Sequence, residues 1–142
     1  MQILVQDLTN FKQLLLNIKG AVKSAGIDIM NDIAYVSKGA APFDTGQLEG
    51  NINSTYKANA NNFTGTLGVS SFNRGFDYGA LRHDYPFNLG EGSLSKGGVT
   101  SNITGQSFSV GYNFAAGTAK SNEGGYVDYI EEKLQEVIDR YS

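Results

Sequence analysis

The sequence predicts an α+β protein: an antiparallel sheet of about four strands packed against a long N-terminal helix and a C-terminal helix. Apolar residues recur at helical spacing near both ends of the chain and alternate with polar residues in between. The segments do not follow the β-α-β rhythm of a parallel sheet. Since 142 residues is the size of one domain, we expect residues 1–142 to form a single unit.

The first predicted element is a helix over about residues 7–38. Its apolar residues fall on one stripe: Leu8, Phe11, Leu15, Ile18, Val22, Ala25, Ile29, Ile33 and Val36. Gly39 stands where a left-handed C-terminal cap belongs. Gly20 and Gly26 interrupt the stripe, so a kink or two shorter helices is an open alternative.

A structural turn is predicted after this helix, at Pro42, Asp44, Thr45 and Gly46. Proline cannot continue a helix, and Asp-Thr-Gly places a side-chain acceptor before a residue that tolerates positive φ. Asp-Thr-Gly is also the active-site tripeptide of aspartic proteases, which use two such carboxylates. Here no apolar strand precedes it, so the turn is the favoured interpretation.

Two hairpins are predicted to form the sheet. The first has alternating strands over residues 51–58 and 63–69, joined by a turn at residues 59–62. The second joins residues 99–103 to 107–114, and Phe108, Val110, Tyr112 and Phe114 give its last strand the clearest alternation in the chain.

Between the hairpins, residues 76–86 suit one or two helical turns, ended by Pro86. Residues 87–98 follow as a long, exposed, glycine-rich loop. Loops of this length are often functional, so we expect it to bind a partner protein through Phe87, Leu89, Leu94 and Lys96. The chain closes with an amphipathic helix that starts near Tyr126.

Composition excludes several classes of protein. Cysteine is absent, so there is no disulfide framework, thiol nucleophile or Cys-ligated metal. The net charge of -3 argues against a free-standing nucleic-acid binder. No apolar stretch approaches the roughly 20 residues that cross a bilayer, so we expect an unprocessed, soluble protein that does not bind membranes.

Acidic charge is concentrated at the C-terminal end. Residues 123–142 hold six acids and two bases, whereas residues 1–122 hold eight acids and nine bases. The outer face of the acidic helix is therefore predicted to be a polar interface or a DNA-repelling surface, and His83 to be a packing or an interface residue. The predicted interface residues are His83, Asp84, Glu131, Glu132 and Glu136.

No catalytic constellation is evident. His83 adjoins Asp84, but sequence neighbours rarely face each other as a catalytic pair requires. Asp28 and Asp32 are like charges at i, i+4, and we expect both on a solvated face. The glycines of residues 90–98 lack phosphate-loop spacing. We therefore expect no enzyme activity, cofactor or metal.

Three segments carry a family resemblance. Residues 41–48, Ala-Pro-Phe-Asp-Thr-Gly-Gln-Leu, resemble the A-P-x-D-T-G-x-L signature of the small head-tail joining proteins of long-tailed bacteriophages. These are also called neck, tail-completion or minor capsid proteins. Residues 78–84 are similar to that family's Y-A-x-x-x-H-E element, with Gly79 and Asp84 in place of Ala and Glu. Residues 124–131 are similar to its closing G-x-A-x-Y-L-E.

The resemblance implies a non-catalytic virion protein, made in the host cytoplasm and located at the head-tail junction. Such a protein forms a ring with copies of itself, with six copies as the expectation and twelve as the alternative. It contacts the head connector and the tail terminator or tail-tube protein, while duplex DNA passes through the lumen without specific binding. A compact domain of this length is roughly 30 to 35 Å wide, so six copies would leave a lumen of roughly 30 Å. The alternatives are a tail terminator that caps the tail tube and a carbohydrate- or surface-binding module.

Overall fold

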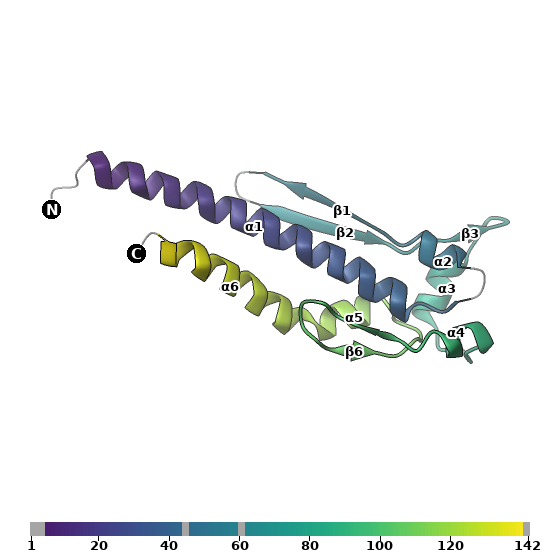
Figure 1. Ribbon diagram of the computed structural model, residues 1–142. Coiled ribbons are helices and arrows are strands. Elements are labelled where there is room, and N and C mark those ends of the chain that lie inside the picture. The colour runs from purple at the N-terminus through teal and green to yellow at the C-terminus, as the bar shows by residue number, and fades with distance from the viewer. Residues whose placement is uncertain (1–4, 44–45, 60–61, 141–142) are drawn as a thin grey trace.

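The α+β class is confirmed in the computed structural model, which describes residues 5–43, 46–59 and 62–140. Helix α1 (Val5–Ala40) is the middle of three layers. The hairpin of β1 (Asn53–Ala58) and β2 (Phe63–Gly68) covers one side of α1, and helix α6 (Glu123–Arg140) packs antiparallel on another side (Figure 1). At 1.5 Å per residue, the 36 residues of α1 span about 54 Å, so the domain is elongated rather than spherical.

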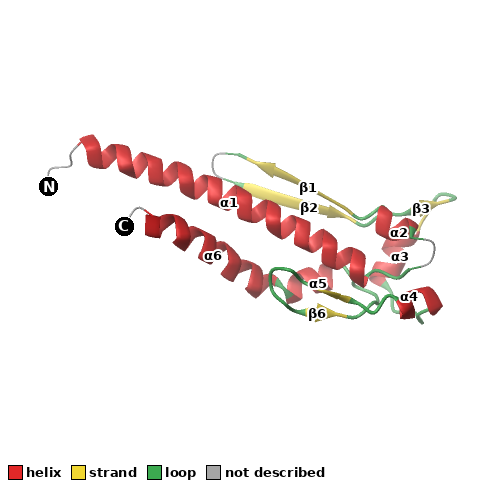
Figure 2. Ribbon diagram, viewed as in Figure 1, coloured by secondary structure: helices red, strands yellow, loops and turns green. Residues whose placement is uncertain are grey.

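Shorter elements gather at the C-terminal end of α1 (Figure 2). They are α2 (Gln47–Gly50), β3 (Phe72–Asn73), β4 (Phe76–Asp77), α3 (Tyr78–Asp84), α4 (Glu91–Ser95), β5 (Val99–Thr100), β6 (Ser107–Phe108) and α5 (Ala116–Ser121). The predicted sheet of about four strands is not confirmed. In the described residues, β1–β2, β3–β4 and β5–β6 form three separate antiparallel pairs.

Helix α1 is continuous, and two of its three glycines, Gly26 and Gly39, mark close approaches of other segments. A Cβ atom at Gly26 would overlap the ring of Phe63 on β2. Gly39 lies inside the helix, against Val99, so its predicted role as a left-handed cap is wrong. The three glycines cost helix propensity, but packing on both sides of α1 outweighs that cost.

The first predicted hairpin is confirmed, with Ser54 opposite Leu67 and Tyr56 opposite Gly65. Residues 54, 56, 58, 63, 65 and 67 share one face. Gly65 meets Met30 of α1 on this face, and a Cβ atom there would overlap the methionine side chain. The opposite face is exposed and polar, and it carries Asn53, Thr55, Lys57, Thr64 and Thr66.

The predicted strand over residues 107–114 is wrong beyond Phe108. Bends follow Ser109, and Asn113 adopts a left-handed φ of 58°. The Gly111 N–H donates to the Ala40 carbonyl, and Phe114 is buried in the core with Ala40, Ala41, Ile52 and Ala115. The apolar residues of this segment therefore fill the end of the core as an irregular chain.

The expected long loop over residues 87–98 is also only partly observed, because it contains α4. The terminal helix is confirmed as α6, which begins at Glu123. Among the described residues, no helix is long and apolar enough to span a bilayer.

Candidate functional site

Exposed apolar side chains cluster at one end of the molecule, which we call the aromatic end. Its residues come from the loop after α1, from β3–β4, from α3 and from α4: Phe43, Phe72, Phe76, Tyr78 and Leu94. Phe72 is 61% exposed and Leu94 is 66% exposed. The rings of Phe76 and Tyr78 meet edge to face, with centroids 5.1 Å apart. Since a monomer gains nothing from exposing so much apolar surface, this end is the main candidate interaction surface.

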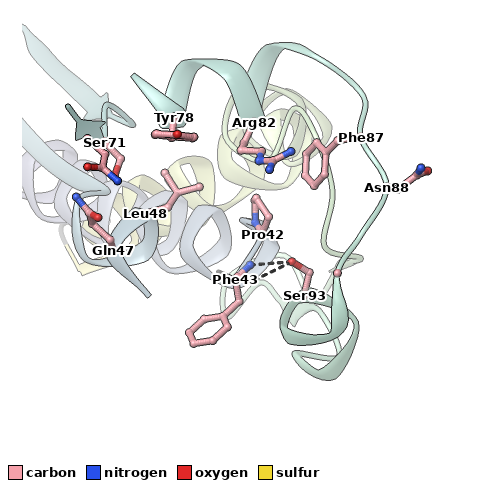
Figure 3. Close-up of a pocket in the computed structure, with 12 residues that line it drawn as sticks. Pro42, Phe43, Gln47, Leu48, Ser71, Tyr78, Arg82, Phe87, Asn88 and Ser93 are labelled. Atoms are coloured by element: carbon pink, nitrogen blue, oxygen red, sulfur yellow. Dashed lines mark hydrogen bonds between the residues drawn. The ribbon is translucent and has the colours of Figure 1, made fainter. Parts of the chain in front are cut away.

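A pocket of about 390 Å³ opens at the aromatic end (Figure 3). It lies between the loop after α1, α2, α3 and the segment that leads to α4. Two of the three segments that carry the family resemblance line it, through Pro42 and Leu48 from the first and Tyr78 and Arg82 from the second. Residues far apart in the sequence thus form one site, which sequence reasoning did not locate.

The pocket combines aromatic rings with polar groups. The Arg82 guanidinium lies 4.8 Å from the centroid of the Phe87 ring, and no ion pair to Arg82 is seen in the described part of the chain. Gln47 and Asn88 add amides, and Gln47 donates to the carbonyl of Phe72 at 3.2 Å. A charged, planar donor against an aromatic ring suits polar ligands with planar or hydroxyl groups.

The predicted structural turn lies at the edge of this pocket. Pro42 is buried, and Gly46 adopts a left-handed φ of 82° immediately before α2, as the sequence predicted. Asp44 and Thr45 lie outside the described residues. Phe43 is held by Ser93, whose hydroxyl accepts from the Phe43 N–H at 2.9 Å and donates to its carbonyl at 3.2 Å.

Lys96 has an intramolecular role. Its ammonium donates to the carbonyls of Lys38 and Ala41, at 2.8 and 2.5 Å, and it pairs with the Glu49 carboxylate. These carbonyls end α1, so Lys96 supplies the C-terminal cap that Gly39 does not. Its side chain is 15% exposed, which leaves little of it for a partner.

The three apolar residues of the predicted partner-binding loop are not equivalent. Phe87 is half-buried in the pocket wall and Leu89 is partly buried, whereas Leu94 projects into solvent from α4. Leu94 is therefore the residue of this set that is best placed to contact another molecule, and its contact with a partner stays a prediction.

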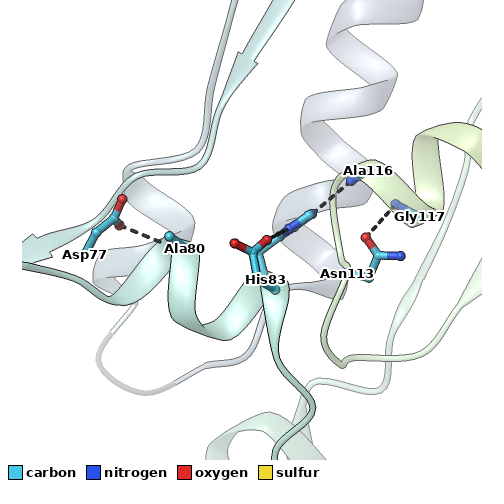
Figure 4. A network of polar contacts seen from close by, with 7 residues as sticks. Asp77, Ala80, His83, Asn113, Ala116 and Gly117 are labelled. Atoms are coloured by element: carbon cyan, nitrogen blue, oxygen red, sulfur yellow. Dashed lines mark hydrogen bonds and ion pairs between the residues drawn. The ribbon is translucent and has the colours of Figure 1, made fainter.

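His83 joins α3 to the start of α5 (Figure 4). Its Nε2 accepts from the Ala116 N–H at 3.0 Å, so the ring hydrogen lies on Nδ1, which donates to Asp84 Oδ1 at 2.9 Å. The ring also meets Phe114 edge to face. His83 and Asp84 thus face each other despite being sequence neighbours, but both ring nitrogens are occupied: Nε2 holds the start of α5 and Nδ1 bonds Asp84 within α3.

Asp77 begins α3 as its N-cap. Its carboxylate accepts from the N–H groups of Ser71 and Ala80, at 2.9 and 3.2 Å. The bond from Ser71, supported by the one from Ala80, lowers the pKa of the Asp77 carboxyl below its ordinary value. The cap and the β3–β4 pair fix the position of Tyr78 at the pocket.

Glu131, Glu132 and Glu136 are exposed on α6, away from the aromatic end (Figure 1). Lys133 lies 3.6 Å from Glu136 and beside the ring of Tyr129. The acidic helix and the pocket are therefore separate surfaces of the molecule, and the interface role of these glutamates stays a prediction.

Asp32 contradicts the expected solvated face, because it is 4% exposed. Its carboxylate accepts from the Tyr126 hydroxyl at 2.7 Å, the Ser101 hydroxyl at 2.6 Å and the Asn102 N–H at 2.8 Å. Burial, together with the bond to Asp32, raises the pKa of Tyr126 above its ordinary value. This buried hub ties α1, the loop after β5 and α6 together, and no spacing in the sequence pointed to it.

Within residues 5–43, 46–59 and 62–140, no group of three or more His, Asp or Glu side chains is close enough to hold a metal ion. No protein-family model, curated protein or solved structure matches the chain.

Proposed function

We propose that this chain is a structural protein of the neck of a long-tailed bacteriophage, where copies form a ring between the DNA-filled head and the tail. The observation that carries the proposal is the aromatic end, where Phe72, Phe76 and Leu94 are exposed and where two of the three segments that carry the family resemblance line one pocket. A ring subunit needs such surfaces, because neighbouring copies and the head connector or tail proteins cover them on assembly.

The elongated shape is compatible with this role. A three-layered domain built on a helix of about 54 Å presents long flanks to its neighbours, and each flank contributes to a head-to-tail contact that closes by rotation. A tail terminator would need the same properties, so this finer role is a variant of the proposal. In both roles DNA passes through the ring without being bound.

The experiment is deletion of the gene from the phage or prophage that encodes the chain. We expect electron microscopy to show separate DNA-filled heads and complete tails, and expression of the chain from a plasmid to restore joined particles. Normal yields of infectious, joined particles after the deletion would refute the neck role. Tails of irregular length would instead favour the tail-terminator variant.

A second candidate, binding of a carbohydrate, is favoured by the pocket itself. Tyr78 and Phe43 are partly exposed beside Gln47, Asn73 and Asn88, as expected of a sugar site. Saturation-transfer NMR with a panel of bacterial surface oligosaccharides tests this, with Arg82→Ala as the control. Loss of a transfer signal in the variant would support it, and the absence of any signal from the wild type would reject it.

A further inference from the structure

We propose that neighbouring copies of this chain join by main-chain pairing of their hairpins, with the outer edge of β1 in one copy against the outer edge of β2 in the next. This inference rests on the proposed ring and names its contact. It starts from the longest hairpin of the fold: in the described part of the chain β1 and β2 pair only with each other, so each strand has one edge without a strand partner.

The register identifies the unpaired groups. The Asn59 N–H donates to the Asn62 carbonyl at 3.0 Å and closes the turn. In an antiparallel ladder, every second pair of facing residues exchanges hydrogen bonds. Starting from the bonded pair 59–62, the bonded pairs within the hairpin are therefore 57–64, 55–66 and 53–68. The main-chain groups of the alternate residues therefore point outward: Ser54, Tyr56 and Ala58 on β1, and Phe63, Gly65 and Leu67 on β2.

Nothing in the described structure covers or blocks these edges. No backbone hydrogen bond joins the outward groups to another described segment. Both strands are mostly exposed, and neither contains proline or a bulge, the usual protection of a free edge. The only charged side chain on either strand, Lys57, points to the polar face rather than along an edge.

A second copy of this chain is the partner that can pair with the outer edges of both β1 and β2. Because β1 and β2 run antiparallel, a copy rotated about an axis places its β2 antiparallel to the first copy's β1, and the apolar and polar faces stay aligned. Each copy then gives one edge and receives the other, which is the head-to-tail contact that closes into a ring. A two-stranded hairpin is only marginally stable by itself, so pairing with a second copy also stabilises the hairpin.

The layers indicate which face is turned inward. On α1, Gly26 and Met30 contact the hairpin, whereas Asp28 and Asp32 contact α6. Because two residues advance about 200° around a helix, these contacts lie on nearly opposite sides of α1. A ring with the hairpins innermost places the polar face in the lumen: Asn53, Thr55, Lys57, Thr64 and Thr66. One lysine per copy among hydroxyl and amide groups suits DNA that must slide.

The size of such a barrel sets the number of copies. With strands about 4.8 Å apart and tilted about 40°, each strand occupies about 6 Å of circumference. Six copies give twelve strands and a backbone diameter of about 24 Å, which inward side chains narrow below the width of a duplex. Twelve copies give a diameter of about 48 Å, which admits DNA. Edge pairing therefore favours a ring of twelve over the ring of six that a spherical domain suggested.

Cysteine pairs test the contact directly, since the chain has no cysteine of its own. In the paired edges, Thr55 would occupy a non-hydrogen-bonded site, where facing side chains are close enough for a disulfide. Thr55→Cys protein mixed with Thr66→Cys or Thr64→Cys protein should form disulfide-linked dimers on mild oxidation of the assembled ring. Each variant oxidised alone should form few. Efficient linking of Thr55→Cys to itself, or no linking in any mixture of assembled protein, would overturn the proposal.

A proline variant separates this contact from the neck role. Ser54→Pro removes an outward N–H without touching the internal ladder, and Ser54→Ala is its matched control. We expect Ser54→Pro to melt near the wild-type temperature by circular dichroism and to lose rings in native mass spectrometry, with at least a tenfold loss of joined particles in complementation. Wild-type yields from Ser54→Pro would refute edge pairing and leave the neck role standing, because only the gene deletion tests that role.

Discussion

At the scale of single residues, polar side chains in this protein act mainly as caps and ties. Lys96 bonds carbonyls at the C-terminal end of α1, Asp77 caps the N-terminus of α3, and His83 bonds the first N–H of α5. Sequence reasoning assigned Lys96 to a partner contact and left His83 open between packing and an interface, because a lone charged or titratable residue in a polar segment carries no sign of its main-chain partner. Both partners lie more than 30 residues away along the chain, and only folding brings them together.

Lys96→Met should destabilise the fold by about 1 to 3 kcal/mol, because it leaves the last carbonyls of α1 and the Glu49 carboxylate without their charged donor. Chemical denaturation followed by circular dichroism measures the change. Lys57→Ala is the control, since Lys57 is exposed on the hairpin and should shift stability by less than about 0.5 kcal/mol. Equal stability of the two variants would contradict the capping role.

Asp32→Asn should cost about 2 to 3 kcal/mol, because an amide cannot accept from two hydroxyls and an N–H as the carboxylate does. Asp28→Asn is matched in chemistry, but Asp28 lies on the surface, where it accepts from the Tyr129 hydroxyl, and the change should cost about 1 kcal/mol or less. Urea unfolding of both variants compares them. A larger loss in Asp28→Asn would mean that the buried hub does not hold the layers.

At the scale of elements, the pairing of α1 with α6 depends on two tyrosine hydroxyls. Tyr129 donates to Asp28 at 2.6 Å, and this bond, followed by desolvation and the Asp28 charge, raises the pKa of Tyr129 to about 12. A raised pKa in the folded state means that the neutral phenol is favoured by folding. The stabilisation is complete below pH 10 and is lost as pH rises toward 12.

Alkaline titration therefore tests the helix pair. The melting temperature of the wild type should fall more steeply between pH 10 and 12 than that of Tyr129→Phe, which lacks the ionisable group. Scanning calorimetry at half-unit steps of pH gives the two curves. Parallel curves would show that the Tyr129–Asp28 bond does not contribute to the stability of the pair.

Helix α4 alters how the aromatic end should be probed. Deletion of residues 91–97 would remove Ser93, which fixes Phe43, and Lys96, which caps α1. The deletion would therefore destabilise the fold around the end of α1 as well as remove an exposed segment. Leu94→Ser is the sharper change, because this side chain is 66% exposed. Stability should shift by less than about 0.5 kcal/mol.

Joined particles should nevertheless fall at least several-fold in complementation by Leu94→Ser, because Leu94 lies at the aromatic end, the surface that we propose is covered on assembly. Val127→Ser offers a control, because Val127 is 48% exposed and belongs to α6 rather than to the aromatic end. Plaque counts with each variant provide the comparison. A wild-type plaque count from Leu94→Ser would show that Leu94 is not part of the assembly surface.

At the scale of the whole molecule, the acidic charge is concentrated in residues 123–142, and the hairpin face that we propose lines the lumen carries one lysine per copy. The assembled chain should bind duplex DNA weakly, with a shallow dependence of affinity on salt, because few cations face the proposed lumen. Fluorescence anisotropy from 50 to 200 mM salt measures this, and Lys57→Ala should leave the slope nearly unchanged. A loss of affinity on the order of a thousand-fold across that range would show extensive phosphate contact and contradict the sliding role.

The sequence by itself determined the α+β class, α1, α3, α6, the β1–β2 hairpin and the turn at Gly46, because each depends on local periodicity or on φ preferences. It did not determine that the strands form separate pairs, that residues 109–114 are irregular, or that Asp32 is buried. Alternation in residues 108–114 has the same period as a strand, but the segment reached the core by packing Phe114 beside Ala40 rather than by pairing with a neighbour. The pocket, the Lys96 cap and the free hairpin edges were decided by tertiary structure alone, since each joins or exposes groups whose partners lie far away in the chain or, as we propose, in another copy.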